Sequence, residues 1–117
     1  MSDLIKENFP KILQSLEMIK KRFETIKTPD DFVLSNEGIT LLDSISMRLQ
    51  VVGELLKKID KHDNTFLNQY PSIEWQQIMR LRDIISHHYD SIDNEIVFDI
   101  CTNHITKLET AIREILN

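Results

Sequence analysis

Apolar residues recur at steps of three and four along almost the whole chain, which is the spacing of helices that bury one face. This spacing predicts a first helix over about Phe9–Lys27, with Asn8 as its cap. Pro10 falls in its first turn, where the missing N–H costs nothing. Pro29 marks a restart of the chain and predicts a short helix that ends at about Leu34.

A longer helix is predicted over about Asn36–Lys61, with Ser35 as its cap. Its apolar positions form a heptad seam of Leu42, Ile45, Leu49, Val52, Leu56 and Ile59. We interpret this seam as core packing within one chain, with a coiled coil between two copies as the alternative. Gly53 lies in the middle of the helix at a cost of about 1 kcal/mol relative to Ala. Its presence predicts a close helix crossing.

The second half of the chain begins with a connection over residues 62–73, which contains one turn of helix around Phe66. A helix from Glu74 to about His88 follows it. The apolar residues of this helix recur at the helical spacing, so we expect one of its faces to pack inward. This face consists of Trp75, Ile78, Leu81 and Ile85, with His88 as a further candidate.

The helical pattern is interrupted at residues 89–92. Ser91 or Asp93 caps a last helix that reaches about Leu116 and bends near residues 102–104, where an apolar step lengthens to five. The inward stripe of this helix consists of Ile96, Ile100, Ile105, Leu108, Ile112 and Ile115. The pattern predicts an all-α fold, an antiparallel bundle of four long helices plus one or two short helices, in a single domain of all 117 residues.

Cysteine content and hydropathy exclude several classes of protein. Cys101 is the one cysteine, so neither an internal disulfide nor a zinc site built from thiolates is possible. No run of about 18 apolar residues is present, so we expect no membrane span. The first residues lack a basic stretch followed by an apolar one, so we expect no signal peptide. These features predict a reducing, cytoplasmic compartment.

The net charge of −5 is distributed unevenly. Residues 1–61 carry ten basic and ten acidic side chains, whereas residues 62–117 carry four basic and nine acidic ones. This balance argues against tight, nonspecific nucleic-acid binding, and no DNA binding is expected. Weak, salt-sensitive contact with RNA and a basic protein partner remain compatible with it. Six basic residues form either a solvated face or a guide for RNA: Lys20, Lys21, Arg22, Lys57, Lys58 and Lys61.

Polar side chains gather near the end of the helix that begins at Glu74: Arg80, Arg82, Asp83, Ser86, His87, His88 and Tyr89. Arginine offers a planar cationic fork suited to phosphate, and histidine titrates near neutral pH, as acid–base catalysis requires. His87 and His88 are adjacent and point about 100° apart on a helix, so no metal site is expected. A histidine at a helix C-terminus also has a purely structural use, because a cation there stabilises the helix dipole.

Arg82 and His87 are five residues apart, which separates them by about 140° around an ideal helix. They can act on one group only if a turn unwinds before His87 or if a second copy of the chain supplies one of them. The interruption that follows the helix permits the first arrangement, and a two-fold homodimer permits the second.

The spacing Arg82-x4-His87-x-Tyr89 resembles the signature of HepT-like proteins, which belong to the HEPN group of helical domains. Asp83 matches the polar residue usual after the arginine, where Asn is commonest, and Arg80 stands where Gly is common. An anion at position 83 can pair with the arginine beside it. The resemblance covers about residues 9–116 and includes Gly53-Glu54, Tyr70–Ile78, Ile92–Phe98 and Asn103–Leu108.

This resemblance implies an HEPN-like fold and the toxin of a toxin–antitoxin pair, a homodimeric, metal-independent endoribonuclease that needs no cofactor. The implied partner is a minimal nucleotidyltransferase that acts as antitoxin. His87 would activate the ribose 2′-hydroxyl or protonate the leaving oxygen, Arg82 would hold the scissile phosphate of the RNA, and Asp83 would orient one of them. Tyr89 matches the tyrosine to which the antitoxin transfers AMP. The supporting positions are Arg80, Ser86 and His88.

Two other functions remain open. The first is a non-catalytic nucleotide- or substrate-binding subunit of a nucleotidyltransferase complex. The acidic second half favours it, because RNA must pass nine carboxylates to reach Arg82. The second is a helical interaction module without a site.

Overall fold

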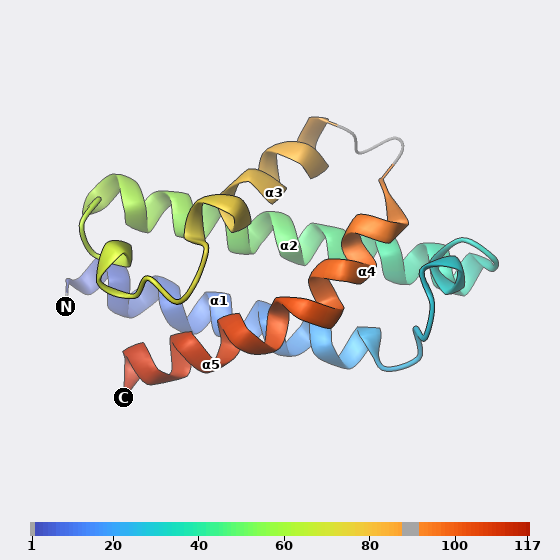
Figure 1. Ribbon diagram of the computed structural model, residues 1–117, viewed down its shortest axis with the longest axis horizontal. Helices are drawn as coiled ribbons and strands as arrows, with labels where there is room; N and C mark the ends of the chain where they lie inside the picture. The colour runs from blue at the N-terminus through green and yellow to red at the C-terminus, as the bar shows by residue number, and fades with distance from the viewer. Residues whose placement is uncertain (1, 88–91) are drawn as a thin grey trace.

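The computed structural model describes residues 2–87 and 92–117, and at Ser86 and His87 only the backbone. These residues contain five α-helices and two 3₁₀ helices and no strand, which confirms the predicted all-α, HEPN-like fold (Figure 1). In chain order the elements are α1 (Asp3–Phe23), η1 (Pro29–Phe32), α2 (Asn36–His62), η2 (Leu67–Gln69), α3 (Trp75–His87), α4 (Asn94–Asn103) and α5 (Ile105–Leu116).

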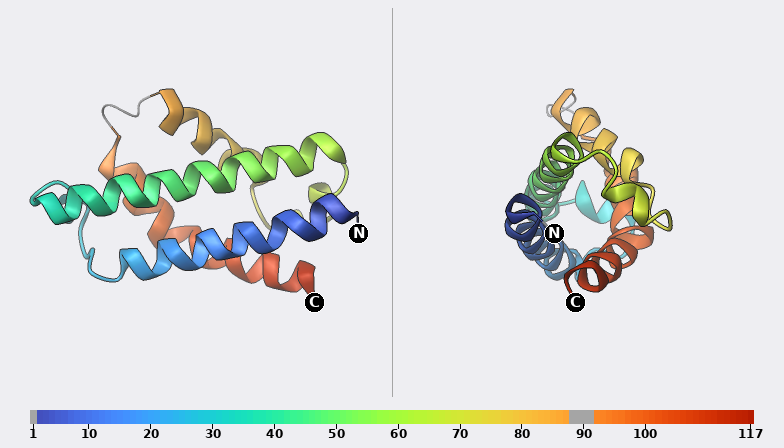
Figure 2. Two further views of the ribbon diagram at one scale, coloured as in Figure 1. Left: turned by 180° about the vertical axis from the view of Figure 1, so that it is seen from behind. Right: turned by 90° about the vertical axis from the view of Figure 1, so that its left-hand side faces the viewer.

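The long helices alternate in direction, as predicted for an antiparallel bundle (Figure 1). α1 and α2 pack along each other, α3 packs mainly on α2, and α5 packs on α1 (Figure 2). The whole apolar seam of α2 is buried within this one chain, which confirms its interpretation as core packing. None of the helices in the described part of the chain is both long and apolar enough to cross a membrane.

The predicted bounds of the first helix are wrong at both ends. α1 begins at Asp3, because the Ser2 hydroxyl caps it by accepting a hydrogen bond from the Ile5 N–H at 3.3 Å. Asn8 is no cap: it is buried inside the helix, and its side-chain amide donates to the Leu4 carbonyl at 2.6 Å. Pro10 therefore lies in the helix interior, where it has no N–H to donate to the Lys6 carbonyl.

Most other expected elements are confirmed. Ser35 caps α2, and α2 ends one residue beyond the predicted Lys61. Of the two candidate caps for the last helix, Asp93 holds this role, because its carboxylate accepts from the Glu95 and Ile96 N–H groups. The predicted bend is a break at His104, which separates α4 from α5. The turn of helix expected around Phe66 is η2, one residue later.

A groove of about 490 Å³ lies between α3 on one side and α4 and α5 on the other. It explains why three residues expected to pack inward are less buried than predicted: Ile78 and Leu81 are half-buried, and Ile96 is 40% exposed. All three line the groove, whose floor is formed by buried residues of the neighbouring helices: Leu49, Val52, Ile100, Ile105 and Leu108.

α2 and α3 pack closely against each other at Gly53, where no room is left for a side chain. A Cβ atom built on Gly53 would lie 2.5 Å from the Cβ of Arg82 and 3.5 Å from its Cα. No real Cβ contact is that short, so α3 can occupy its place only because position 53 is glycine. The close crossing predicted from Gly53 is therefore confirmed, and its partner is Arg82.

We expect Gly53→Ala to destabilise the fold. Overpacking typically costs about 1–3 kcal/mol, which exceeds the gain of about 1 kcal/mol from placing Ala in a helix. Urea unfolding should show a net loss of up to about 2 kcal/mol. Ser44→Ala, a small substitution in the same helix, controls for helix propensity. A Gly53→Ala variant as stable as the unmodified chain would contradict the packing described at Arg82.

Candidate functional site

Arg82 is held at the surface between two carboxylates. Its Nε and Nη2 groups donate to one Glu54 oxygen at 3.4 and 3.3 Å, and its Nη1 donates to Oδ1 of Asp83 at 3.0 Å. The side chain remains 36% exposed. The arginine fork is thus positioned by both α2 and α3, with its Cβ against Gly53.

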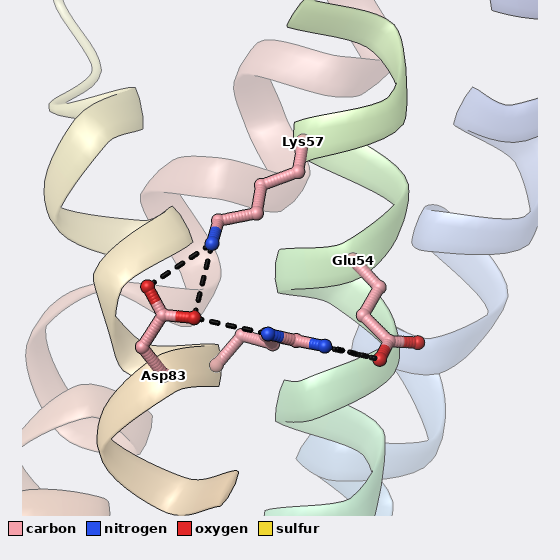
Figure 3. Close-up of polar contacts among 4 residues, drawn as sticks. Glu54, Lys57 and Asp83 are labelled. Carbon is pink, nitrogen blue, oxygen red and sulfur yellow. Dashed lines mark hydrogen bonds and ion pairs between the residues drawn. The ribbon is translucent and has the colours of Figure 1, made fainter. Parts of the chain in front are cut away.

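Asp83 also binds a second cation, Lys57 of α2. The Lys57 ammonium donates to both Asp83 oxygens at 3.0 Å (Figure 3). Lys57 follows Glu54 by three residues, so the two lie on neighbouring positions of one helix face. Glu54, Lys57, Arg82 and Asp83 form a connected chain of ion pairs with no net charge, which we call the ion quartet.

Hydrogen bonds shift the pKa values of two members of the ion quartet, Asp83 and Arg82. The bonds from Lys57 and then from Arg82 lower the pKa of Asp83 below its usual value of 3.8. The bonds from Arg82 to Asp83 and then to Glu54 raise the pKa of its guanidinium. At neutral pH Asp83 is therefore an anion and Arg82 a cation. Asp83 can orient a cation but cannot donate a proton.

The contact between Gly53 and Arg82 divides the α2–α3 pair into two faces. Successive helical residues point about 100° apart, and the two helices are antiparallel, so residues on either side of the contact fall on opposite faces. Glu54 and Asp83 follow the contact residues and belong to the ion quartet, whereas Val52 and Leu81 precede them and line the groove. The groove and the ion quartet therefore open on opposite sides.

The other predicted site residues are placed only in part. Arg80 lies on α3 but is exposed, and it makes no ion pair with any residue in the described part of the chain. Ser86 and His87 form the end of α3, for which the backbone alone is described. His88 and Tyr89 lie outside the described residues. The structure thus brings together Arg82 and Asp83 and does not test the remaining assignments.

The backbone of α3 bears on how Arg82 and His87 can cooperate. α3 is α-helical from Trp75 to His87, so no turn unwinds between the two positions. They lie about 140° apart around the helix axis. Of the two arrangements considered from the sequence, unwinding before His87 is wrong.

Glu54 and Lys57 are the members of the ion quartet that sequence reasoning did not assign to the site. Glu54 stood out only through the Gly53-Glu54 pair, and Lys57 only as one of six scattered basic residues. The sequence does contain one signal for them. Glu54 and Lys57 carry opposite charges three residues apart on α2, and these complement the adjacent opposite charges of Arg82 and Asp83. The sequence alone does not show that these charges lie opposite each other, because their alignment depends on how α2 and α3 pack in the fold.

Cys101 is not a candidate nucleophile. It is 8% exposed, and burial raises the pKa of its thiol to about 12. The thiolate, which is the reactive form, is therefore scarce at neutral pH.

Comparison with known proteins gives a family. The chain matches the family described as Ribonuclease HepT-like over residues 12–115, which include both helices of the ion quartet. This match confirms the resemblance noted from the sequence. No solved structure matches the chain significantly.

Three curated relatives are similar to this chain. A protein of Methanocaldococcus jannaschii, provisionally named an RNase, is 38% identical over 68 residues, which are 58% of this chain and 54% of that protein. A second protein of this organism, named a gamma-glutamylcyclotransferase and provisionally an RNase, is 30% identical over 105 residues, 90% and 44% of the respective lengths. A protein of Caldanaerobacter subterraneus subsp. tengcongensis, provisionally named an RNase, is 28% identical over 105 residues, 90% and 88% of the lengths. The chain spans about half the length of the first two.

The lowered pKa of Asp83 can be measured directly. Titration of its side-chain carboxyl carbon by NMR should give a midpoint below 3.8. Because the folded-state pKa is depressed, the ion pairs of Asp83 stabilise the fold above pH 3.8 and are lost as the pH falls through the lowered value.

Lys57→Met should raise the Asp83 midpoint, since Lys57 is the largest cause of the shift. Lys58→Met is the matched control, because it removes the same charge from the next residue of α2 and should leave the midpoint unchanged. An Asp83 midpoint at or above 3.8 in the unmodified chain would show that the ion quartet does not form.

Proposed function

Because this chain belongs to the HepT-like ribonuclease family, we propose that it is an RNA-cleaving toxin of a toxin–antitoxin pair. The observation that carries this proposal is the presentation of Arg82. Its planar fork is anchored at the surface by a helix crossing and two carboxylates, which suits it to a phosphate group. The names of the relatives, all provisional RNases, agree with this substrate class.

The proposed reaction uses the ribose as its own nucleophile. His87 takes the proton of a 2′-hydroxyl or gives one to the leaving 5′-oxygen. The 2′-oxygen attacks the adjacent phosphorus and the 5′-oxygen departs, which leaves a 2′,3′-cyclic phosphate and a 5′-hydroxyl. Arg82 stabilises the charge that grows on the phosphate oxygens, and Asp83 positions Arg82. A DNA strand lacks the 2′-hydroxyl and would not be cleaved, and no metal ion takes part.

We propose a two-fold homodimer in which each cleft takes Arg82 from one copy and His87 from the other. The continuous helix of α3 supports this arrangement, because positions 82 and 87 diverge by about 140° on one chain. A two-fold axis makes two equivalent composite clefts.

The proposed regulation acts at Tyr89. A minimal nucleotidyltransferase would transfer AMP from ATP, with the tyrosine oxygen attacking the α-phosphorus and pyrophosphate leaving. The added group brings bulk and negative charge next to the motif, which would repel the RNA phosphate from Arg82.

A non-catalytic nucleotide- or substrate-binding subunit is the second candidate. Two observations favour it: both cations of the ion quartet are already paired with carboxylates, and the apolar groove of about 490 Å³ has the size of a small-molecule site. The two candidates differ in one outcome, which is cleavage of RNA by the purified chain.

The composite cleft predicts restored activity on mixing two inactive variants. Purified chain should cleave a labelled RNA in the presence of EDTA and leave the DNA of the same sequence intact. Arg82→Ala and His87→Ala should each abolish cleavage and growth arrest. Unfolded together and refolded as an equal mixture, they should regain about a quarter of the unmodified activity, because half the dimers are mixed and each of these has one intact cleft.

Three outcomes would contradict this proposal in different ways. Full activity of His87→Ala would remove the catalytic assignment. Inactive single variants that stay inactive when mixed would place Arg82 and His87 in the same copy. Absence of cleavage by the unmodified chain would favour the binding subunit.

Nucleotidylation predicts a mass increase confined to one side chain. Incubation with ATP and a minimal nucleotidyltransferase should add one or more AMP masses and stop RNA cleavage. Tyr89→Phe should lose the added mass, whereas Tyr70→Phe, the other tyrosine of the chain, should retain it. Intact-protein mass spectrometry measures both, and a mass gain that persists in Tyr89→Phe would move the modification elsewhere.

A further inference from the structure

Two cations of the ion quartet converge on one oxygen. Lys57 Nζ and Arg82 Nη1 each lie 3.0 Å from Oδ1 of Asp83, so the two nitrogen atoms are no more than 6.0 Å apart. A single phosphate group can accept hydrogen bonds from two donors at such a separation, because it carries several oxygens. Asp83 therefore holds an ammonium and a guanidinium together in the way that a bound anion would.

Both cations keep donors for a further ligand. An ammonium has three N–H donors and a guanidinium five. Counting only contacts with described residues, Asp83 uses two donors of Lys57 and one of Arg82, and Glu54 uses two of Arg82. One N–H of Lys57 and two of Arg82 are left.

The two carboxylates differ in how firmly they are held. Glu54 accepts through one oxygen at 3.3 and 3.4 Å, and its side chain is 57% exposed. Asp83 accepts three bonds at 3.0 Å and is 41% exposed. An anion that approaches Arg82 would therefore displace Glu54 more easily than Asp83, and the departure of Glu54 frees two more donors of the arginine fork.

We propose that Lys57 is a second phosphate-binding cation of the site, held beside Arg82 by Asp83, and that Glu54 is the carboxylate that an RNA phosphate displaces. The proposal rests on the proposed function for its ligand, single-stranded RNA. The RNA phosphate and the Glu54 carboxylate then compete for the same cation, Arg82. This competition weakens RNA binding, as the acidic composition also predicts, but the paired cations still bind a phosphate.

The salt dependence of RNA binding tests Lys57 without requiring cleavage. A fluorescent single-stranded RNA with 2′-O-methyl riboses cannot be cleaved by its own 2′-oxygen, and its dissociation constant can be measured by anisotropy at several KCl concentrations. Each phosphate contact contributes about 0.7 to the slope of log K against log salt concentration for a single strand. Lys57→Met should reduce this slope by about 0.7 and weaken binding, whereas Lys57→Arg should retain the slope.

Lys58→Met is the matched control, since Lys58 is exposed and makes no ion pair with the described residues of the chain. It should leave the slope close to that of the unmodified chain. Glu54→Gln should tighten binding several-fold, because the competing charge is gone. Circular dichroism melting of each variant shows whether the helical fold is retained.

The results separate this inference from the nuclease assignment. Equal slopes for Lys57→Met, Lys58→Met and the unmodified chain overturn the role of Lys57, even if the chain cleaves RNA. A reduced slope for Lys57→Met alone supports it, even if no cleavage is found. Absence of measurable RNA binding by the unmodified chain overturns it, and so does weaker binding by Glu54→Gln.

Discussion

The close approach of α2 and α3 at Gly53 is the constraint on which the rest of the site depends. A hydrogen atom in place of a side chain lets the backbone of α3 reach α2, with Arg82 lying directly against the glycine. The arginine stem then crosses α2, and its head reaches Glu54, the next residue along that helix. One packing contact thus determines both the position of the motif helix and the electrostatic partners of its arginine.

The ion quartet shows that the net charge of the chain does not describe the charge at the site. The net charge of −5 describes the whole surface, but the site itself combines two cations and two anions. Local geometry therefore decides whether a phosphate can be accommodated, because charges within a few ångströms outweigh those beyond a screening length of about 8–10 Å. An acidic protein can in this way contain a phosphate site.

The sequence predicted the succession of helices well, but it misplaced the ends of one helix and indicated few of the contacts between helices. α2 is predicted to within one residue, because Ser35 and an unbroken apolar seam mark it clearly. α1 was misplaced because Asn8 has the chemistry of a cap although it is buried within the helix. Glu54 and Arg82 are 28 residues apart, and nothing local indicates that they meet. The roles of His87 and Tyr89 came from family resemblance and stay predictions.

The one-sided packing of α3 has a consequence for local stability. α3 packs mainly on α2, and its other flank borders the groove. Helices with few buried contacts open at a lower free energy than the global unfolding of a domain. α3 contributes Trp75, Met79 and Ile85 to the core but packs mainly on one neighbour, so its local opening should cost less free energy than the opening of α1 or α2, which pack on several elements.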